Sequence, residues 1–200
     1  MTERNMTMDE TLKEQQKRAK KPLLWIAQAS MFMAFAGLMS GYLVSKGSME
    51  EKGLWMEFSL PDQFLYSTIT LAISSILLVI GRRALRGNNQ QTFLIGLLGA
   101  WALSFVFTYF QFQSWDDLID RGIFFTGPGS NVSGSWIYAL SFLHFAHVIG
   151  GIIALSVTSI NALLKKYHAD EMLGFDLAST YWHFLGLVWL ILYLFLNFVR

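Results

Sequence analysis

The sequence predicts an all-α membrane protein, a bundle of five transmembrane helices with a cytoplasmic N-terminus and a periplasmic C-terminus. Of the 200 residues, 54% are hydrophobic and only 14% are charged, whereas about a quarter are charged in soluble domains. Five stretches are almost free of charge, and each approaches or exceeds the ~18 apolar residues that cross a bilayer as a helix. None shows the period-2 alternation of a membrane β-strand, so helices are expected throughout.

The expected elements begin with a polar segment, residues 1–21, which is mixed in charge and too acidic for a transit peptide. We interpret it as a cytoplasmic extension, helical in part at most, that precedes a five-helix domain of residues 22–200. The first span, 22–45, is rich in small residues, which allow helices to approach closely in lipid. Pro22 stands at its edge, where it leaves the helix unbroken.

The remaining spans are expected at 64–81, 91–112, 136–164 and 177–199. The fourth shares the small-residue pattern of the first. The longest connection, 113–135, contains TGPGSNVSGS, a composition typical of surface turns.

The distribution of Lys and Arg supports the orientation, because these residues concentrate in short cytoplasmic loops. Eleven of the 15 basic residues lie on one expected side, and this side includes the N-terminus: Arg4, Lys13, Lys17, Arg18, Lys20, Lys21, Arg82, Arg83, Arg86, Lys165 and Lys166. The other side receives Lys46, Lys52, Arg121 and Arg200. With a net charge of +1, nucleic acid is not expected as a partner.

Inside the spans there is no Asp, Glu, Lys or Arg except at the extreme ends, although proton relays and ion pumps require such groups. Three histidines stand out: His144 and His147 in one expected helix, and His183 in the last. The chain has no cysteine, which excludes thiolate metal sites. His144 and His147 alone provide too few ligands for a metal ion.

Haem ligation by two of these histidines is the alternative, and it implies a small b-type, quinol-reactive membrane cytochrome. Helix rise from the expected span ends places His147 roughly 4 to 5 Å outside the membrane centre and His183 roughly 7 to 8 Å inside it. Axial ligands of one haem lie at similar depth, so this separation of about 12 Å disfavours a shared haem. We therefore expect the histidines to be neutral and hydrogen-bonded to facing hydroxyls, carbonyls or lipid headgroups.

Two histidine motifs carry a family resemblance. YWHFLGLVWLILYLF at the C-terminus resembles the last helix of subunit III of haem-copper oxidases, and GSWIYALSFLHFAHVIGG resembles the family's segment with two histidines. Weaker similarities occur in YFQFQSWDDL, LPDQFLYSTITLAISS and MFMAFAGLMSGYL. The matching positions outside the YWHF motif include Pro61, Thr68, Ser74, Ser75, Gln111, Trp115, Leu118, Gly134, Ser135, Leu140, His144, His147 and Val148.

The resemblance implies the five-helix form of subunit III of a bacterial aerobic terminal oxidase, in the inner membrane. Such a subunit has no redox centre or catalytic site of its own, and supports the stability and the oxygen or proton supply of the catalytic subunit. It also implies haem and copper in partner subunits I and II, and bound phospholipid. The electron donor, cytochrome c or a quinol, the haem type and membership of a larger respiratory supercomplex stay open.

The expected structural, lipid-contact or subunit-contact residues are His144, His147, His183, Trp182, Gln111, Trp115, Arg82 and Arg83. Among them, Trp182, His183 and one of the two arginines are expected near inner-leaflet headgroups, where Arg attracts anionic lipid. Three carboxylates of the family pattern are replaced here, by Ala29, Ser114 and Gly186. A proton-supply role at those positions is therefore not expected from the residues present.

Overall fold

The computed structural model describes residues 2–168 and 171–199, with side chains at 14, 15 and from 17 onward. Its five helices are α1 (Thr2–Glu50), α2 (Gln63–Arg86), α3 (Gln90–Asp120), α4 (Val132–Leu163) and α5 (Leu173–Phe198). All five are long and apolar enough to span a membrane, which confirms the predicted number and type of elements. Arg200, one of the basic residues assigned to the outer side, lies outside the described residues.

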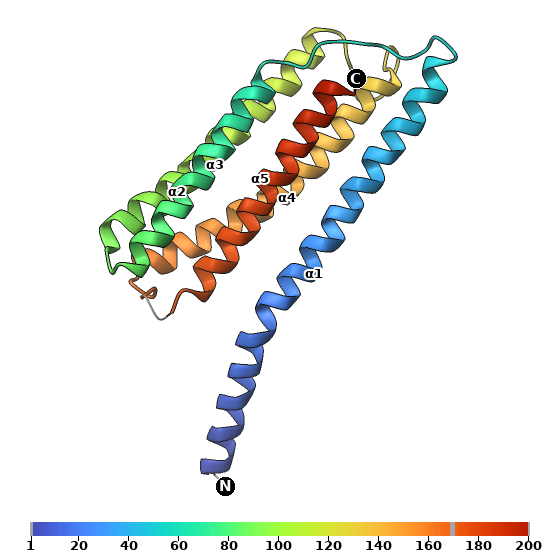
Figure 1. Cartoon of the computed structure of the whole chain (residues 1–200). Coiled ribbons are helices and arrows are strands. Elements are labelled where there is room, and N and C mark those ends of the chain that lie inside the picture. Colours follow the sequence, from blue (N-terminus) through green and yellow to red (C-terminus); the bar gives the residue numbers. More distant parts are fainter. Residues whose placement is uncertain (1, 169–170, 200) are drawn as a thin grey trace.

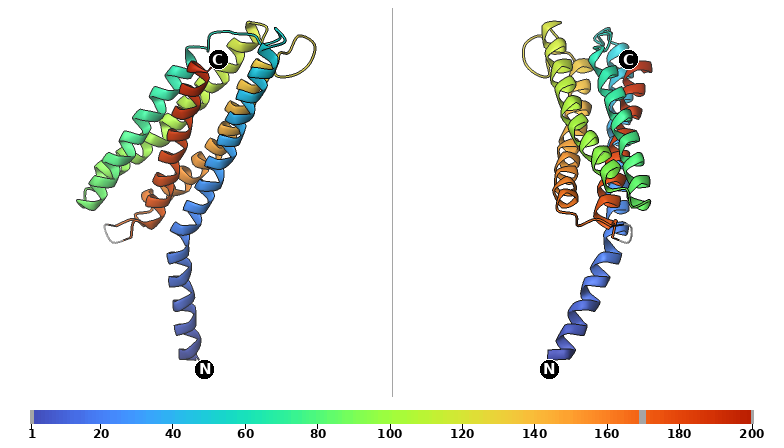
Figure 2. Two further views of the ribbon diagram at one scale, coloured as in Figure 1. Left: turned by 45° about the vertical axis from the view of Figure 1, so that its right-hand side comes forward. Right: turned by 90° about the vertical axis from the view of Figure 1, so that its left-hand side faces the viewer.

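The helices α2–α5 lie side by side as a bundle, and α1 lies along one edge of it (Figure 1). We call the N-side the end that carries the α2–α3 and α4–α5 connections. The C-side carries the α1–α2 and α3–α4 connections. Figure 2 shows α1 projecting beyond the bundle on the N-side. The basic residues of α2 and of the α4–α5 connection, Arg82, Arg83, Arg86, Lys165 and Lys166, all belong to that end.

Helix α1 differs from the expectation because it begins at Thr2 and includes the whole polar segment. The expectation of partial helicity at most is therefore wrong for residues 2–21. Pro22 lies inside the helix, where its ring removes one backbone hydrogen bond without ending the element. Lys, Arg, Glu and Gln predominate around it and are strong helix formers, so the segment continues the helix outside the apolar span.

A few polar and aromatic contacts hold α1 to the bundle. The Gln28 side-chain amide donates to the Thr180 carbonyl at 3.3 Å, and Lys46 Nζ donates to the Val199 carbonyl at 2.9 Å. Between them, the buried Tyr42 packs edge-on against Trp55 and Phe195. Only 11% of the most apolar window of α1 is buried inside the chain, against 33–39% in the other spans. Most of α1 therefore faces the surroundings of the protein.

The closest helix pair is α2 with α3, and two glycines determine it. Gly81 and Gly96 face each other, and a Cβ built on Gly96 would lie 2.7 Å from the Leu77 carbonyl oxygen and 3.1 Å from Gly81 Cα. These neighbours are backbone atoms, which cannot rotate away. Small residues at such a crossing let two membrane helices pack backbone to backbone.

The α3–α4 connection is shorter than expected, because α3 continues to Asp120 and α4 begins at Val132. The end of α3 is a Schellman motif: the Ile123 N–H donates to the Leu118 carbonyl and the Gly122 N–H to the Ile119 carbonyl. Gly122 takes a φ of +74°, a conformation that glycine adopts without steric cost. The polar residues before it extend α3 beyond the apolar stretch, so the boundary at residue 112 is wrong.

Candidate functional site

The residues singled out in the sequence lie in three places. Gln111, Trp115, His144 and His147 lie along α3 and α4, Trp182 and His183 lie on α5, and Arg82 lies on the N-side where α2 meets the start of α5. Within the described residues, no three His, Cys, Asp or Glu side chains form a group that could hold a metal ion.

His144 lies in the interior of the bundle and is fully buried. Its ring lies 5.0 Å from the Trp189 ring, 6.1 Å from Phe35 and 6.3 Å from Phe107, measured between centroids. Neither ring nitrogen has a hydrogen-bond partner within the described part of the chain. The expected hydrogen bond is therefore absent for His144, and aromatic packing surrounds the ring instead. A porphyrin could reach this imidazole only by displacing those rings.

His147 is half-buried and does make a hydrogen bond of the expected kind, between Nδ1 and the Leu143 carbonyl of its own helix at 2.7 Å. The Tyr181 hydroxyl donates to the His147 carbonyl at 3.2 Å, which links α4 to α5. The ring also contacts Phe35, with centroids 5.7 Å apart. His147 thus takes part in the packing of three helices.

The offset between His147 and His183 is smaller than the sequence suggests. Gly151, four residues or about 6 Å of helix rise beyond His147, packs on the Trp182 ring. Because α5 runs antiparallel to α4, His183 lies one residue back toward the level of His147, and the two histidines are offset by about 4.5 Å along the bundle axis. The expected 12 Å came from span ends placed too far along both helices. In the structure α4 and α5 each begin four residues earlier, at Val132 and Leu173.

Gln111 and Trp115 hold α3 against its two neighbours. The Gln111 amide donates to Ser67 Oγ of α2 at 3.1 Å, and Trp115 Nε1 donates to Ser141 Oγ of α4 at 3.1 Å. Gln111 is fully buried, and its Oε1 has no partner within the described residues. Both are interhelical hydrogen bonds of the kind that stabilise membrane bundles by a fraction of a kcal/mol to about 2 kcal/mol each.

Two indoles connect α5 to α2 in a similar way. Trp182 Nε1 donates to Ser74 Oγ at 2.8 Å and Trp189 Nε1 donates to Thr68 Oγ1 at 3.0 Å. Both rings are essentially fully buried. Trp182 is therefore a packing residue in the interior of the chain and not a residue of its surface, which is the structural one of the roles expected for it.

Arg82 forms an ion pair with Asp176 in the first turn of α5, with Nη2 and Oδ1 3.0 Å apart. The Asp176 side chain is 16% exposed and that of Arg82 is 43% exposed. The carboxylate also lies at a helix N-terminus, where the macrodipole favours negative charge. Asp176 is not among the residues expected from the sequence. The signal that could have identified it is an acidic residue in the first turn of a helix, on the same side of the membrane as a cluster of basic residues.

We expect Asp176→Asn to destabilise the chain by roughly 1–2 kcal/mol, because it leaves the half-buried Arg82 without its counter-charge. The measurement is the free energy of unfolding in mixed micelles. Arg83→Gln, one position along on the exposed face, is the control and should change stability by less than about 0.5 kcal/mol. Equal effects in the two variants would contradict the assignment.

At the three positions where the resemblance implies a carboxylate, this chain has Ala29, Ser114 and Gly186, none of which can titrate. Ser114 is fully buried and its hydroxyl donates to the Phe110 carbonyl of its own helix at 2.8 Å. A Cβ on Gly186 would lie 3.5 Å from Ser75 Oγ of α2. Ala29 is exposed, next to the buried Gln28.

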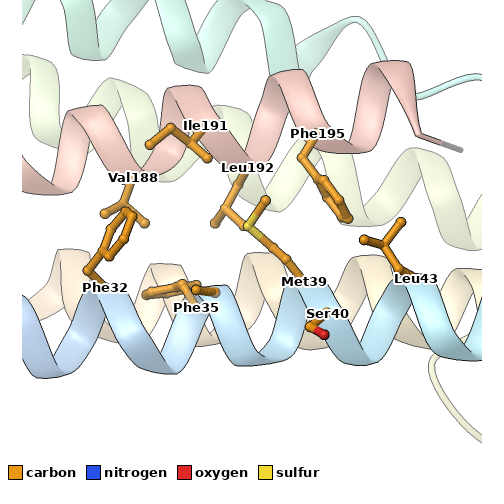
Figure 3. Close-up of a pocket in the computed structure, with 10 residues that line it drawn as sticks. Phe32, Phe35, Met39, Ser40, Leu43, Val188, Ile191, Leu192 and Phe195 are labelled. Carbon is orange, nitrogen blue, oxygen red and sulfur yellow. The ribbon is translucent and has the colours of Figure 1, made fainter.

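An apolar groove of about 280 Å³ lies between α1 and α5 (Figure 3). Phe32 and Met39 of α1 point across it toward Val188 and Leu192 of α5, and Phe35 and Phe195 also line it. Aliphatic and aromatic side chains form nearly all of the lining. The groove has the chemistry for a hydrocarbon chain, with the Ser40 hydroxyl as a polar group in its lining.

Comparison with known proteins gives one consistent family. A family model described as "Cytochrome c oxidase subunit III" matches residues 29–199. A protein of Nocardia farcinica named "Probable cytochrome c oxidase subunit 3" is 28% identical over 191 residues, which cover 89% of this chain and 86% of the relative. The "Cytochrome c oxidase subunit 3" of Corynebacterium diphtheriae is 28% identical over 186 residues, with the same coverage.

A longer relative shows a different coverage. The "Cytochrome c oxidase subunit 3" of Schizophyllum commune is 31% identical over 141 residues, which cover 70% of this chain but only 49% of that protein. The chain thus spans most of its bacterial relatives and about half of this fungal one.

Proposed function

Because the chain belongs to the cytochrome c oxidase subunit III family, we propose that it packs beside the catalytic subunit I and subunit II of a bacterial aerobic terminal oxidase. The family is that of a non-catalytic subunit, so haem and copper are assigned to the partner subunits. The membrane is the bacterial inner membrane, with the N-side of the bundle in the cytoplasm. The eleven basic residues on that side support this orientation.

The observation that carries the proposal is the interior of the bundle. Four of its polar side chains, Gln111, Trp115, Trp182 and Trp189, form hydrogen bonds between helices, and these bonds hold the bundle together as a scaffold. The lightly buried α1 and the groove beside it offer apolar surface for lipid chains or for a neighbouring subunit. We infer a supporting role: to hold lipid and protein around the catalytic subunit and so to prolong its activity.

Deletion of the chain is expected to leave the haem content of the oxidase unchanged and to shorten its lifetime during turnover. The physical reason is that the chain supplies packing surface but no haem ligand. The measurement combines the reduced-minus-oxidised spectrum of the purified oxidase with the decay of oxygen consumption over successive turnovers. Reintroducing the chain on a plasmid is the control.

Loss of haem from the deleted complex would contradict this function. The alternative, a haem-carrying cytochrome, predicts that the isolated chain shows a Soret band and that this band disappears in His147→Ala. The enclosure of His144 by aromatic rings disfavours this alternative.

A further inference from the structure

An apolar pocket of about 450 Å³ lies on the C-side, where α3, the connection after it and α4 meet. Its volume is in the range of about 300–1,000 Å³ that is typical of ligand pockets. It is separate from the α1–α5 groove of Figure 3. Aromatic side chains form most of the lining, which consists of Trp115, Ile119, Phe125, Tyr138, Ala139 and Phe142.

The two hydrogen-bond donors among the lining side chains are already engaged within the chain. Trp115 Nε1 donates to Ser141 Oγ at 3.1 Å, and the Tyr138 hydroxyl donates to the Ile123 carbonyl at 2.9 Å. A carbonyl or carboxylate that entered the pocket would therefore leave water without gaining a side-chain donor, which is unfavourable. The pocket selects an apolar group, which gains free energy simply by leaving water.

Hydrogen bonds hold the wall of the pocket in place. Ser135 Oγ of α4 donates to the Phe125 carbonyl at 2.7 Å, which fixes the part of the connection that carries the Phe125 ring. The bond from Tyr138 to Ile123 ties the same connection to α4 a second time. A wall that is already ordered loses little conformational freedom when the pocket is filled.

Two carboxylates without a counter-charge lie beside the pocket. Asp116 and Asp120 are exposed, one turn apart on the same face of α3, and Asp116 is close enough to Tyr138 to interact with it electrostatically. Neither aspartate forms an ion pair with a residue that the structure describes, whereas Asp117 pairs with Arg121. This rim repels anionic headgroups and attracts Lys or Arg.

The pocket also lies at the depth where a membrane helix changes from apolar to polar. The apolar stretch of α3 ends near residue 112, and Gln113 and the acidic residues follow it. A neighbouring helix at this depth has apolar side chains up to the edge of the hydrocarbon region. A Lys or Arg just beyond that edge extends its charged end toward water.

We propose that this C-side surface docks a transmembrane helix of another subunit of the oxidase, which places an apolar side chain in the pocket and a Lys or Arg beside Asp116 and Asp120. Interface energy concentrates in aromatic pockets of this kind, and charges at the rim determine which partner fits. The inference rests on the proposed function in one respect, that the partner belongs to the same complex.

The test places the photo-crosslinking amino acid p-benzoylphenylalanine at Phe142, which lines the pocket and is 64% exposed. After irradiation the oxidase is purified through its haem-containing subunit, and mass spectrometry identifies the attached peptide or lipid. The charge variant combines Asp116→Lys and Asp120→Lys. The matched control combines Glu50→Lys and Glu51→Lys, which make the same change of charge at exposed positions at the end of α1, outside the pocket lining.

We expect a crosslink to a peptide of another subunit in which Lys or Arg follows an apolar segment within about one helical turn. The charge variant should lower the yield of this crosslink about tenfold or more, because it places like charges opposite each other. The control should keep the yield of the parent chain. Ala139→Trp fills the pocket without a change of charge, and it should lower the yield by a similar factor while the complex unfolds at the same temperature.

A crosslink to lipid alone, to no protein, or to a segment without basic residues would overturn the partner. Equal losses in the charge variant and the control would overturn the site in favour of general surface charge. An unchanged yield in Ala139→Trp would show that the pocket is not used. Co-purification of the chain with the haem-containing subunit tests the proposed function separately, so a chain that co-purifies but crosslinks only to lipid contradicts this inference alone.

Discussion

Gly96→Leu is expected to destabilise the bundle more than any other single change considered, by about 3 kcal/mol or more. Even a Cβ at this position would lie 2.7 Å from the Leu77 carbonyl oxygen and 3.1 Å from Gly81 Cα. Relief of this overlap requires α2 and α3 to separate. Separation removes the close packing on which helix association in lipid depends, because lipid chains are as apolar as the side chains and supply no compensating hydrophobic force.

The free energy of unfolding in mixed micelles measures this effect. Gly37→Leu is the matched control, because Gly37 is also a glycine inside a membrane helix but nothing lies within 4 Å of its built Cβ. It should change stability by less than about 0.5 kcal/mol. If the two variants lose the same stability, helix propensity and not the α2–α3 crossing is responsible.

Trp182→Ala is expected to lower the free energy of unfolding by about 3 kcal/mol. The ring is fully buried, it packs against Gly151, and its indole N–H donates to Ser74 Oγ at 2.8 Å. Removal of the ring opens a cavity where α2, α4 and α5 meet and leaves the Ser74 hydroxyl without its interhelical donor. The cavity contributes the larger share, since a single hydrogen bond in a membrane protein is worth about 0.6 kcal/mol on average.

Two further variants separate these contributions. Trp182→Phe fills most of the cavity and loses only the hydrogen bond, so its loss should be about 1 kcal/mol. Trp25→Ala provides the control, because Trp25 is 66% exposed on α1 and should have a small effect on unfolding. A loss in Trp25→Ala as large as that in Trp182→Ala would show that interface anchoring, not interior packing, dominates.

The positions of the helices were predictable to within a turn for most ends, because apolar runs of this length have no alternative to a helix in lipid. The exceptions are the start of α1 and the ends of α1, α2 and α3, which lie where polar residues continue a helix beyond the apolar run. There hydropathy carries no signal, and helix propensity and the Gly122 turn determine where the helix ends.

For the candidate residues too, some features were predictable from the sequence and others were not. The burial of Gln111 and the need of the Trp115 indole N–H for a partner were foreseeable, because polar atoms require partners in a membrane. The identity of each partner was not, because Ser67, Ser141 and Ser74 are among many hydroxyls in the chain. His144 shows the limit most clearly: its type predicts a hydrogen bond, yet it lies among aromatic rings without one.

By itself the sequence determined the class of the protein, the number of its helices and, through two histidine motifs, its family resemblance, since composition and local motifs are properties of the chain alone. Only the tertiary structure decided that Arg82 meets Asp176, that Gly96 sets the α2–α3 crossing, and that α3, the connection after it and α4 form one apolar pocket beside Asp116. These features join residues far apart in the chain. In lipid, close packing and specific polar contacts, not hydropathy, select which helices meet.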